Sequence, residues 1–292
     1  MPADKTWHEY LYYKRMMQTT RVLLLIALIA WSERAVAGVM DTITTYSKSM
    51  RKEIPSVIIL PDNYQDTSLH FPVVYLLHGY SGNYSHWPLI APQLQNLADE
   101  YQMILVSPDG GYRSWYIDSP IDSTIKYETY ITKELIPDID TRYRTKTDRW
   151  SRAITGLSMG GHGGLYLGIR HKELFGAAGS MSGGVDLRQY TASWDLKEKI
   201  LGDTICCKQN WETHSVINVI NDLKNGELNM IIDCGVDDFF IGVNRALNQK
   251  LLKMKIAHDY IERPGAHNAE YWRNSVDYQL LYFHKYFVTH TN

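Results

Sequence analysis

The chain has 292 residues, 45% of them hydrophobic and 12% aromatic, which is enough apolar material for one large core or two small ones and excludes a disordered chain. Its 30 Lys and Arg residues against 32 Asp and Glu residues leave a net charge of −2, and no basic run is dense enough to bind a phosphate backbone. These numbers argue against nucleic acid as a partner.

The first 37 residues have the pattern of a secretory signal peptide. Arg21 is followed by the apolar run VLLLIALIAW and, after a short polar break, by the small residues AVA. The run has about ten residues, whereas a membrane-spanning helix needs about 20. We therefore expect cleavage before Gly38, a secreted or periplasmic protein, and no stable membrane insertion after cleavage. Met16 and Met17 leave two interpretations of residues 1–15: part of the leader, or an over-extension of the gene.

Three cysteines allow at most one disulfide within the chain: the neighbours Cys206 and Cys207, and Cys234. Cys234 ends an apolar run, which predicts a small buried side chain.

Seven apolar runs bounded by turn residues predict strands, at residues 56–61, 71–79, 102–111, 152–158, 176–184, 228–235 and 258–265. Segments with helical spacing lie between them, for example residues 123–143 and 240–256. This alternation predicts an α/β fold with a mostly parallel central sheet and helices on both faces. We expect residues 38–292 to form a single catalytic domain with its chemistry at the carboxyl ends of the strands.

A cluster of glycines surrounds one serine in the stretch AITGLSMGGHGGLYLG, where a predicted strand meets a predicted helix. Gly156, Ser158 and Gly160 form the GxSxG pattern of a nucleophile elbow, in which small neighbours permit a sharp turn that exposes the hydroxyl. The alternative is a glycine-rich turn with an incidental serine. The strand before it and the helix after it favour the elbow.

A serine nucleophile requires a base and an acid further along the chain. His267 is the candidate base, because it lies in a glycine-containing loop after the final predicted strand. Asp237 and Asp238 both lie just past the end of a late strand and could orient the imidazole, with Asp233, inside that strand, as a third candidate. The residues alone leave the choice of aspartate open.

An oxyanion hole needs two main-chain N–H groups, one from the residue after the nucleophile and one from the loop after an early strand. Met159 supplies the first, and Tyr80, in the loop LLHGYSGNYSHW, is the candidate for the second. His78, in the same loop, is expected to be a packing residue.

Aromatic residues in two loops could contact a substrate. Trp115 and Trp87 are the predicted substrate-binding residues, with core packing as the alternative for Trp115. Tyr116 is expected to pack in the core. His162 is expected to face the sheet or a neighbouring loop, with a ligand-binding role as its alternative.

Six motifs together resemble a known family: YLLHGYSGNYSHW, SPDGGYRSWYIDSP, ELIPDIDTRYRT, RAITGLSMGGHGGLYLGIRHKELFGAAGSMSGG, CGVDDFF and PGAHNAEYW. The chain looks like the esterase D / antigen 85 branch of the α/β-hydrolases, which includes S-formylglutathione hydrolases, mycolyltransferases, and the feruloyl and acetyl-xylan esterases of carbohydrate esterase family 1. The resemblance extends from about residue 56 to about residue 286. It implies a single α/β-hydrolase domain without a large lid, Asp238 as catalytic acid, Tyr80 and Met159 as oxyanion donors, and no cofactor or metal.

The sequence thus predicts an exported serine carboxylesterase with the triad Ser158, His267 and Asp238. Its expected substrates are small-molecule or polysaccharide esters, such as acetyl or feruloyl groups on polysaccharide, or short-chain esters. The alternatives are a thioesterase of the S-formylglutathione hydrolase type, an acyltransferase and, from a different class, a non-catalytic carbohydrate-binding protein. No pattern in the sequence determines an oligomeric state.

Overall fold

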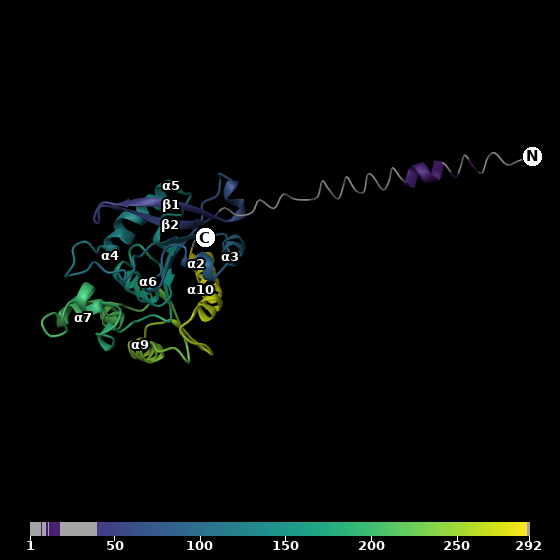
Figure 1. Ribbon diagram of the computed structural model, residues 1–292. Coiled ribbons are helices and arrows are strands. Elements are labelled where there is room, and N and C mark those ends of the chain that lie inside the picture. Colours follow the sequence, from purple (N-terminus) through teal and green to yellow (C-terminus); the bar gives the residue numbers. More distant parts are fainter. Residues whose placement is uncertain (1–6, 8–9, 11, 18–39, 291–292) are drawn as a thin grey trace, which may run out of the picture. The chain divides into compact units, whose positions relative to one another are not determined.

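The computed structural model describes residues 7, 10, 12–17 and 40–290 (Figure 1). The chain divides into two compact units, Met1–Ala37 and Gly38–Asn292, and the second holds the whole sheet. The apolar core and the cleavage site of the predicted signal peptide lie outside the described residues. Within the part that the structure describes, no helix is both long enough and apolar enough to cross a membrane.

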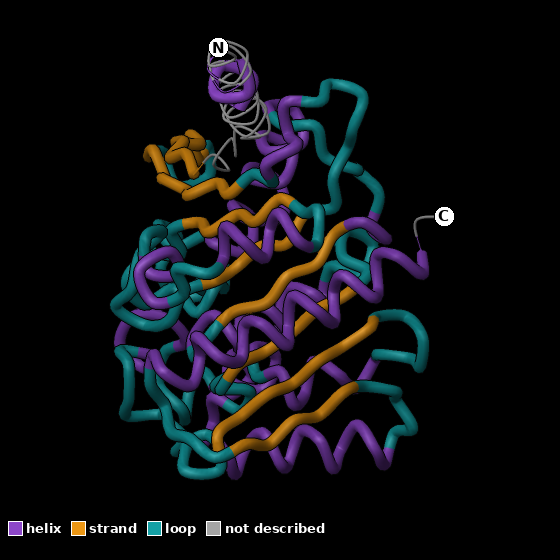
Figure 2. The backbone as a smooth tube through the Cα atoms, turned by 90° about the vertical axis from the view of Figure 1, so that its right-hand side faces the viewer, coloured by secondary structure: helices purple, strands orange, loops and turns teal. Residues whose placement is uncertain are grey.

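Residues 40–290 contain one sheet of eight strands in the order β1-β2-β4-β3-β5-β6-β7-β8. The pairs from β4 to β8 are parallel, whereas β2 is antiparallel to both β1 and β4. Figure 2 shows the strands side by side, with helices in front of them and behind. The strands are β1 (Met40–Ser47), β2 (Lys52–Ile59), β3 (Val73–Leu77), β4 (Ile104–Pro108), β5 (Arg152–Gly156), β6 (Ala177–Met181), β7 (Asn229–Gly235) and β8 (Asp259–Arg263).

Helices cover both faces of this sheet, because successive side chains of a strand point to opposite faces. Val74 packs with the first group of helices and Tyr75 with the second. The first group, which lies together in Figure 1, is α2 (His86–Ile90), α3 (Leu94–Glu100) and α10 (Ala269–His290). The second is α4 (Tyr127–Thr129), α5 (Ile136–Arg142), α6 (Met159–Arg170), α7 (Lys208–His214), α8 (Val216–Val219) and α9 (Ile241–Lys253). Cys234 is buried, as predicted.

Strand β1 was not among the predicted strands. This strand lies at the edge of the sheet, pairs only with β2, and has mostly exposed side chains. One face of β1 is exposed, and on the other face Thr45 and Ser47 are buried polar residues that donate to Asp138 and Glu134. MDTITTYS therefore lacks the apolar run that marks the inner strands. The pairing with β1 also extends β2 back to Lys52, beyond the apolar residues that predict it.

The helical segment predicted at residues 123–143 begins later and is less regular than its spacing indicates. It starts at Tyr127, widens into the π-helical turn η2 (Tyr130–Leu135) and continues as α5. Pro137 has no N–H to donate to the carbonyl of Lys133, so the regular ladder is interrupted there and the preceding turn widens.

Short helical turns fill the connections. The crossover between β6 and β7, residues 182–228, is the longest of them and carries η4 (Leu187–Gln189), the π-helical turn η5 (Leu196–Leu201), α7, α8 and η6 (Ile220–Asp222). Two further short turns lie in other connections: η1 (Asp62–Gln65), between β2 and β3, and η3 (Arg149–Ser151), just before β5. The crossover starts at the carboxyl end of β6, and so reaches the edge of the sheet where β5 ends.

Candidate active site

Ser158 occupies a sharp turn between β5 and α6. Its backbone has φ 56° and ψ −114°, an uncommon conformation for a residue with a side chain. The turn closes on itself, since the N–H of Gly160 donates to the carbonyl of Leu157 at 2.7 Å. A Cβ on Gly156 would lie 2.5 Å from the carbonyl oxygen of Leu77. The glycines therefore permit both the strained turn and the close approach of helix to sheet.

Three side chains from distant parts of the chain meet at this turn. The Oγ of Ser158 lies 2.8 Å from Nε2 of His267, and Nδ1 of His267 lies 2.8 Å from Oδ2 of Asp238. The other carboxylate oxygen of Asp238 accepts the N–H of Phe240 at 2.8 Å. This is the hydrogen-bonded order of a Ser-His-Asp triad, in which the carboxylate orients the imidazole and the imidazole can take the hydroxyl proton.

The tertiary structure distinguishes the three candidate aspartates. Asp238 is buried against His267, whereas the side chain of Asp237 is exposed. Asp233 is buried within β7, where it pairs with Arg263 and accepts hydrogen bonds from Tyr271 and Ser275. Burial raises the pKa of Asp233 above its usual range. The side-chain partners of Asp233 among residues 40–290 are Arg263, Tyr271 and Ser275, and neither Ser158 nor His267 is one of them. Of the three, Asp238 is the aspartate in contact with His267.

The two predicted oxyanion donors have no hydrogen-bond partner among residues 40–290. The N–H groups of Tyr80 and Met159 are both without an acceptor there. Met159 is the first residue of α6, so its N–H has no partner within the helix. Free main-chain donors at a helix start favour a negative charge near Ser158, as an oxyanion hole requires.

His78 holds the peptide group that carries the N–H of Tyr80. Its Nδ1 donates to the carbonyl of Gly79 at 2.8 Å, and its Nε2 accepts the N–H of Gly110 at 2.7 Å. These two bonds require a neutral imidazole. Burial lowers the pKa of His78 to about 4, which agrees with that requirement. The packing role expected for His78 therefore includes fixing the orientation of a candidate oxyanion donor.

The two predicted substrate-binding tryptophans lie in the core. Trp87 is 0% exposed and donates from Nε1 to the carbonyl of Leu77, and Trp115 is 1% exposed. Contact with a substrate would require either ring to become accessible, so that role stays a prediction. Tyr116 is buried, as expected, and its hydroxyl donates to the carbonyl of His78. The ring nitrogens of His162 lie 3.0 and 2.8 Å from the carbonyl oxygens of Trp115 and His214, which gives His162 a structural position.

Three aromatic rings that the sequence analysis did not single out surround the imidazole of His267. Their centroids lie 4.2, 5.3 and 4.9 Å from it, for Phe239, Phe240 and Trp272 respectively. Their position in the motifs CGVDDFF and PGAHNAEYW, beside the candidate acid and base, was the available signal. The sequence does not show which of these rings contacts His267, because that depends on how the two loops pack against each other.

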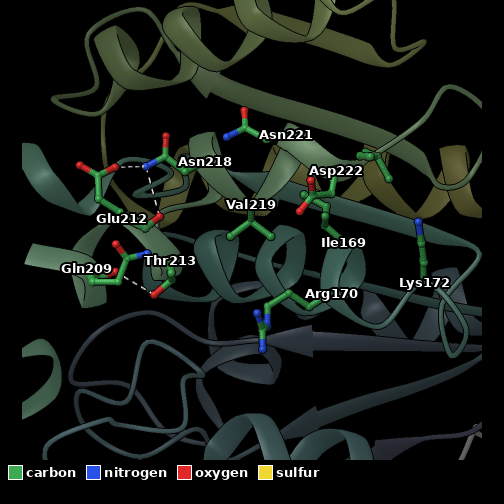
Figure 3. Close-up of a pocket in the computed structure, with 11 residues that line it drawn as sticks. Ile169, Arg170, Lys172, Gln209, Glu212, Thr213, Asn218, Val219, Asn221 and Asp222 are labelled. Carbon is green, nitrogen blue, oxygen red and sulfur yellow. Dashed lines mark hydrogen bonds between the residues drawn. The ribbon is translucent and has the colours of Figure 1, made fainter.

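A separate hollow lies at the other end of α6 (Figure 3). Residues from the end of α6, from α7 and from the α8–η6 segment line it, and none of them belongs to the triad. Three of its charged groups have ion-pair partners: Lys172 with Glu227, Glu212 with Arg188, and Arg170 with Glu128. Among all the residues that the structure describes, no group of three or more His, Cys, Asp or Glu side chains is arranged to hold a metal ion.

Comparison with known proteins identifies the family. A family model described as "Putative esterase" matches residues 47–283, more than half of the chain. The chain belongs to this esterase family. An acetyl esterase of Caldicellulosiruptor saccharolyticus is 26% identical over 252 residues, which cover 80% of the chain and 94% of that protein. Esterase Rv1288 of Mycobacterium tuberculosis is 28% identical over 235 residues, covering 72% of the chain but only 51% of the relative's length.

Solved structures of related proteins share the esterase's architecture. A ferulic acid esterase matches with a TM-score of 0.74 at 26% identity, over 86% of this chain and 99% of that one. The serine hydrolase FphF of Staphylococcus aureus matches with a TM-score of 0.75 at 19% identity, over 85% of this chain and 98% of that one, which shows the fold alone. The predicted α/β-hydrolase fold and the predicted family membership are confirmed.

Proposed function

We propose that this esterase is a serine carboxylesterase that works through an acyl-enzyme on Ser158. The observation that supports the proposal most directly is the continuous hydrogen-bonded chain from the Ser158 hydroxyl through His267 to Asp238, with 2.8 Å at each step. A serine hydroxyl is a weak nucleophile at neutral pH and needs such a base. The same order of partners argues against an incidental serine in a glycine-rich turn.

In the first step, Oγ of Ser158 attacks the ester carbonyl while its proton passes to Nε2 of His267. The N–H groups of Tyr80 and Met159 stabilise the oxyanion of the tetrahedral intermediate. The C–O bond to the alcohol then breaks, and His267 gives its proton to the leaving alcohol. Water attacks the acyl-enzyme with His267 as base, which releases the carboxylic acid and restores the Ser158 hydroxyl. Asp238 stabilises the imidazolium in both steps.

We propose acyl groups on polysaccharide, acetyl or feruloyl, as the natural substrates, with short-chain esters as accessible test substrates. The names of two relatives, an acetyl esterase and a ferulic acid esterase, support this class. Action on an extracellular polymer agrees with the signal-peptide pattern of residues 1–37, which motivates the proposal that the protein is secreted or periplasmic.

Replacing Ser158 with alanine tests the proposal. Hydrolysis of p-nitrophenyl acetate should fall by about three orders of magnitude or more, because triad members act as a unit. A fluorophosphonate probe should form a P–O bond to Oγ of Ser158 in the wild type, with loss of HF, which a mass shift of the Ser158 peptide shows, and should leave the S158A protein unlabelled. An unchanged melting temperature would show that the variant is folded. Retained turnover in a folded S158A protein would reassign the nucleophile.

A further inference from the structure

An exposed group of aromatic side chains borders the candidate active site. We call Tyr190, Trp194 and Phe239 the aromatic rim. Phe239 is 54% exposed although its ring lies beside those of His267 and Trp194, and Tyr190 and Trp194 are partly exposed. A single exposed ring is common on a protein surface, whereas a contiguous group of partly exposed rings marks a contact surface. The position of this group beside the catalytic histidine therefore indicates binding.

The two segments that carry the rim are held together. The hydroxyl of Tyr190 donates to the carbonyl of Phe239 at 3.2 Å, and the rings of Trp194 and Phe239 stack at 6.0 Å with an interplanar angle of 24°. Trp194 and Asp195 both have positive φ, 54° and 56°. Such backbone is uncommon outside glycine and persists where the surrounding structure holds it. The crossover thus presents Trp194 in a fixed position beside Phe239.

The position of the rim indicates which part of an ester it would contact. Nε2 of His267 gives its proton to the leaving alcohol, so the alcohol oxygen must lie beside the imidazole. The ring of Phe239 lies 4.2 Å from that of His267, whereas the oxyanion, between Tyr80 and Met159, belongs to the carbonyl. Atoms beyond the alcohol oxygen are therefore the part of the substrate nearest to Phe239.

Polar groups next to the rim favour a hydroxylated alcohol over a hydrocarbon chain. The carboxylate of Asp195, the neighbour of Trp194, binds Arg113 at 2.5 Å and accepts the hydroxyl of Tyr80 at 3.1 Å. Arg113 and Asp195 are each more than a third exposed, so both can still bind other groups. A hydrocarbon covering this pair would remove its water without replacing the hydrogen bonds. A sugar offers an apolar C–H face to a ring and hydroxyls that donate and accept at its edge.

We propose that the aromatic rim, with Asp195 and Arg113 beside it, is the binding site for the sugar ring of the leaving alcohol. This inference rests on the proposed function, because it takes His267 as the group that protonates the alcohol. Phe239 is the central contact of the site, since it is the most exposed member of the rim and lies against the catalytic imidazole.

The test compares two acetyl esters that differ only in the alcohol: an acetylated xylo-oligosaccharide and ethyl acetate. In F239A the ratio of kcat/KM for the sugar ester to kcat/KM for ethyl acetate should fall about tenfold, as expected for one lost stacking contact. The matched control is Tyr46→Ala, because Tyr46 is an aromatic residue with similar exposure, 52%, on edge strand β1. That variant should keep the wild-type ratio.

Binding without turnover separates this inference from the proposed function. In the S158A background, isothermal titration with unmodified xylohexaose should give a Kd that rises about tenfold when Phe239 is also replaced by alanine. If S158A still hydrolyses esters but this rise is seen, the proposed nucleophile is wrong and the sugar site stands. If S158A is inactive but neither the ratio nor the Kd depends on Phe239, the sugar site is overturned and the esterase mechanism stands.

A third ester tells which part of the substrate meets the rim. If F239A lowers kcat/KM for methyl ferulate while the ratio for the two acetyl esters is unchanged, the rim binds the acyl group, and the proposal is wrong. An equal fall for all three esters would mean that Phe239 acts by positioning His267, which overturns the proposal as well.

Discussion

The two ends of helix α6 are both polar, yet they differ in what their polar groups are bound to. At the start of the helix, the N–H groups of Met159 and Tyr80 lack an acceptor among residues 40–290, and the Ser158 hydroxyl meets a histidine. At its end, about 18 Å away for a helix of this length, three charges that line the hollow are already paired: Lys172 with Glu227, Glu212 with Arg188 and Arg170 with Glu128. Stabilising an oxyanion requires N–H donors that are not already bound to an acceptor. The presence of a hollow is therefore a poorer guide to the active site than the presence of unpaired donors beside a nucleophile.

The sharpest test of this comparison is the loss of the carboxylate behind His267. Asp238→Asn should lower kcat about 10⁴-fold, because an amide no longer fixes the imidazole tautomer or stabilises the imidazolium. Steady-state assay with p-nitrophenyl acetate measures it. Asp237→Asn, one residue away and exposed, and Lys172→Met, at the far end of α6, should both stay within about twofold of wild type. Similar losses in Asp238→Asn and Asp237→Asn would remove the distinction between the two aspartates.

The neutral histidine beside the oxyanion loop predicts a pH dependence of stability. The pKa of His78 is about 4 in the folded protein, whereas an unfolded histidine titrates near 6.5. Between these values the unfolded chain binds a proton that the folded chain does not. The free energy of unfolding should therefore fall as the pH falls from about 6.5 to about 4, and His78 should account for on the order of 3 kcal/mol of this fall. Below pH 4, His78 should cause no further change.

Urea denaturation at pH 7 and pH 4.5 measures the effect. His78→Gln removes the titrating group, so the difference in unfolding free energy between the two pH values should be smaller in this variant than in the wild type. An equal pH difference in both proteins would show that His78 does not carry the effect.

Two glycines in similar helices should respond to alanine with opposite signs. A Cβ on Gly164, in α6, would lie 2.5 Å from the carbonyl oxygen of Gly179 on β6, so Gly164→Ala should destabilise the protein by about 1–3 kcal/mol. Gly242, in α9, has nothing within 4 Å of such a Cβ, so Gly242→Ala should be neutral or stabilising by up to about 1 kcal/mol. Thermal and urea denaturation measure both. Destabilisation by Gly242→Ala equal to that by Gly164→Ala would argue against close packing of α6 on the sheet.

The inner strands were predictable because burial on both faces leaves a continuous apolar run in the sequence. Strand β1 was not, since its stability comes from pairing with β2 at the edge of the sheet. The nucleophile was predictable for a related reason: the turn at Ser158 requires small residues two positions before and after it, Gly156 and Gly160, and that steric demand is visible as GxSxG. No local sequence pattern predicts the aromatic rim, because its members come from two loops far apart in the chain.

The sequence by itself determined the α/β architecture, the elbow at Ser158 and the short list of acids and bases, because each depends on local patterns of burial and backbone sterics. The local motifs left Asp237 and Asp238 open, and the family resemblance favoured Asp238. Only the tertiary structure showed the hydrogen bond between Asp238 and His267, the burial of Trp87 and Trp115 in the core, and the exposure of Phe239 beside the imidazole. The physical reason is that neighbouring residues in a loop face different surroundings. Which side chain becomes buried and which stays exposed depends on the segments that pack against the loop, and those are distant in the chain.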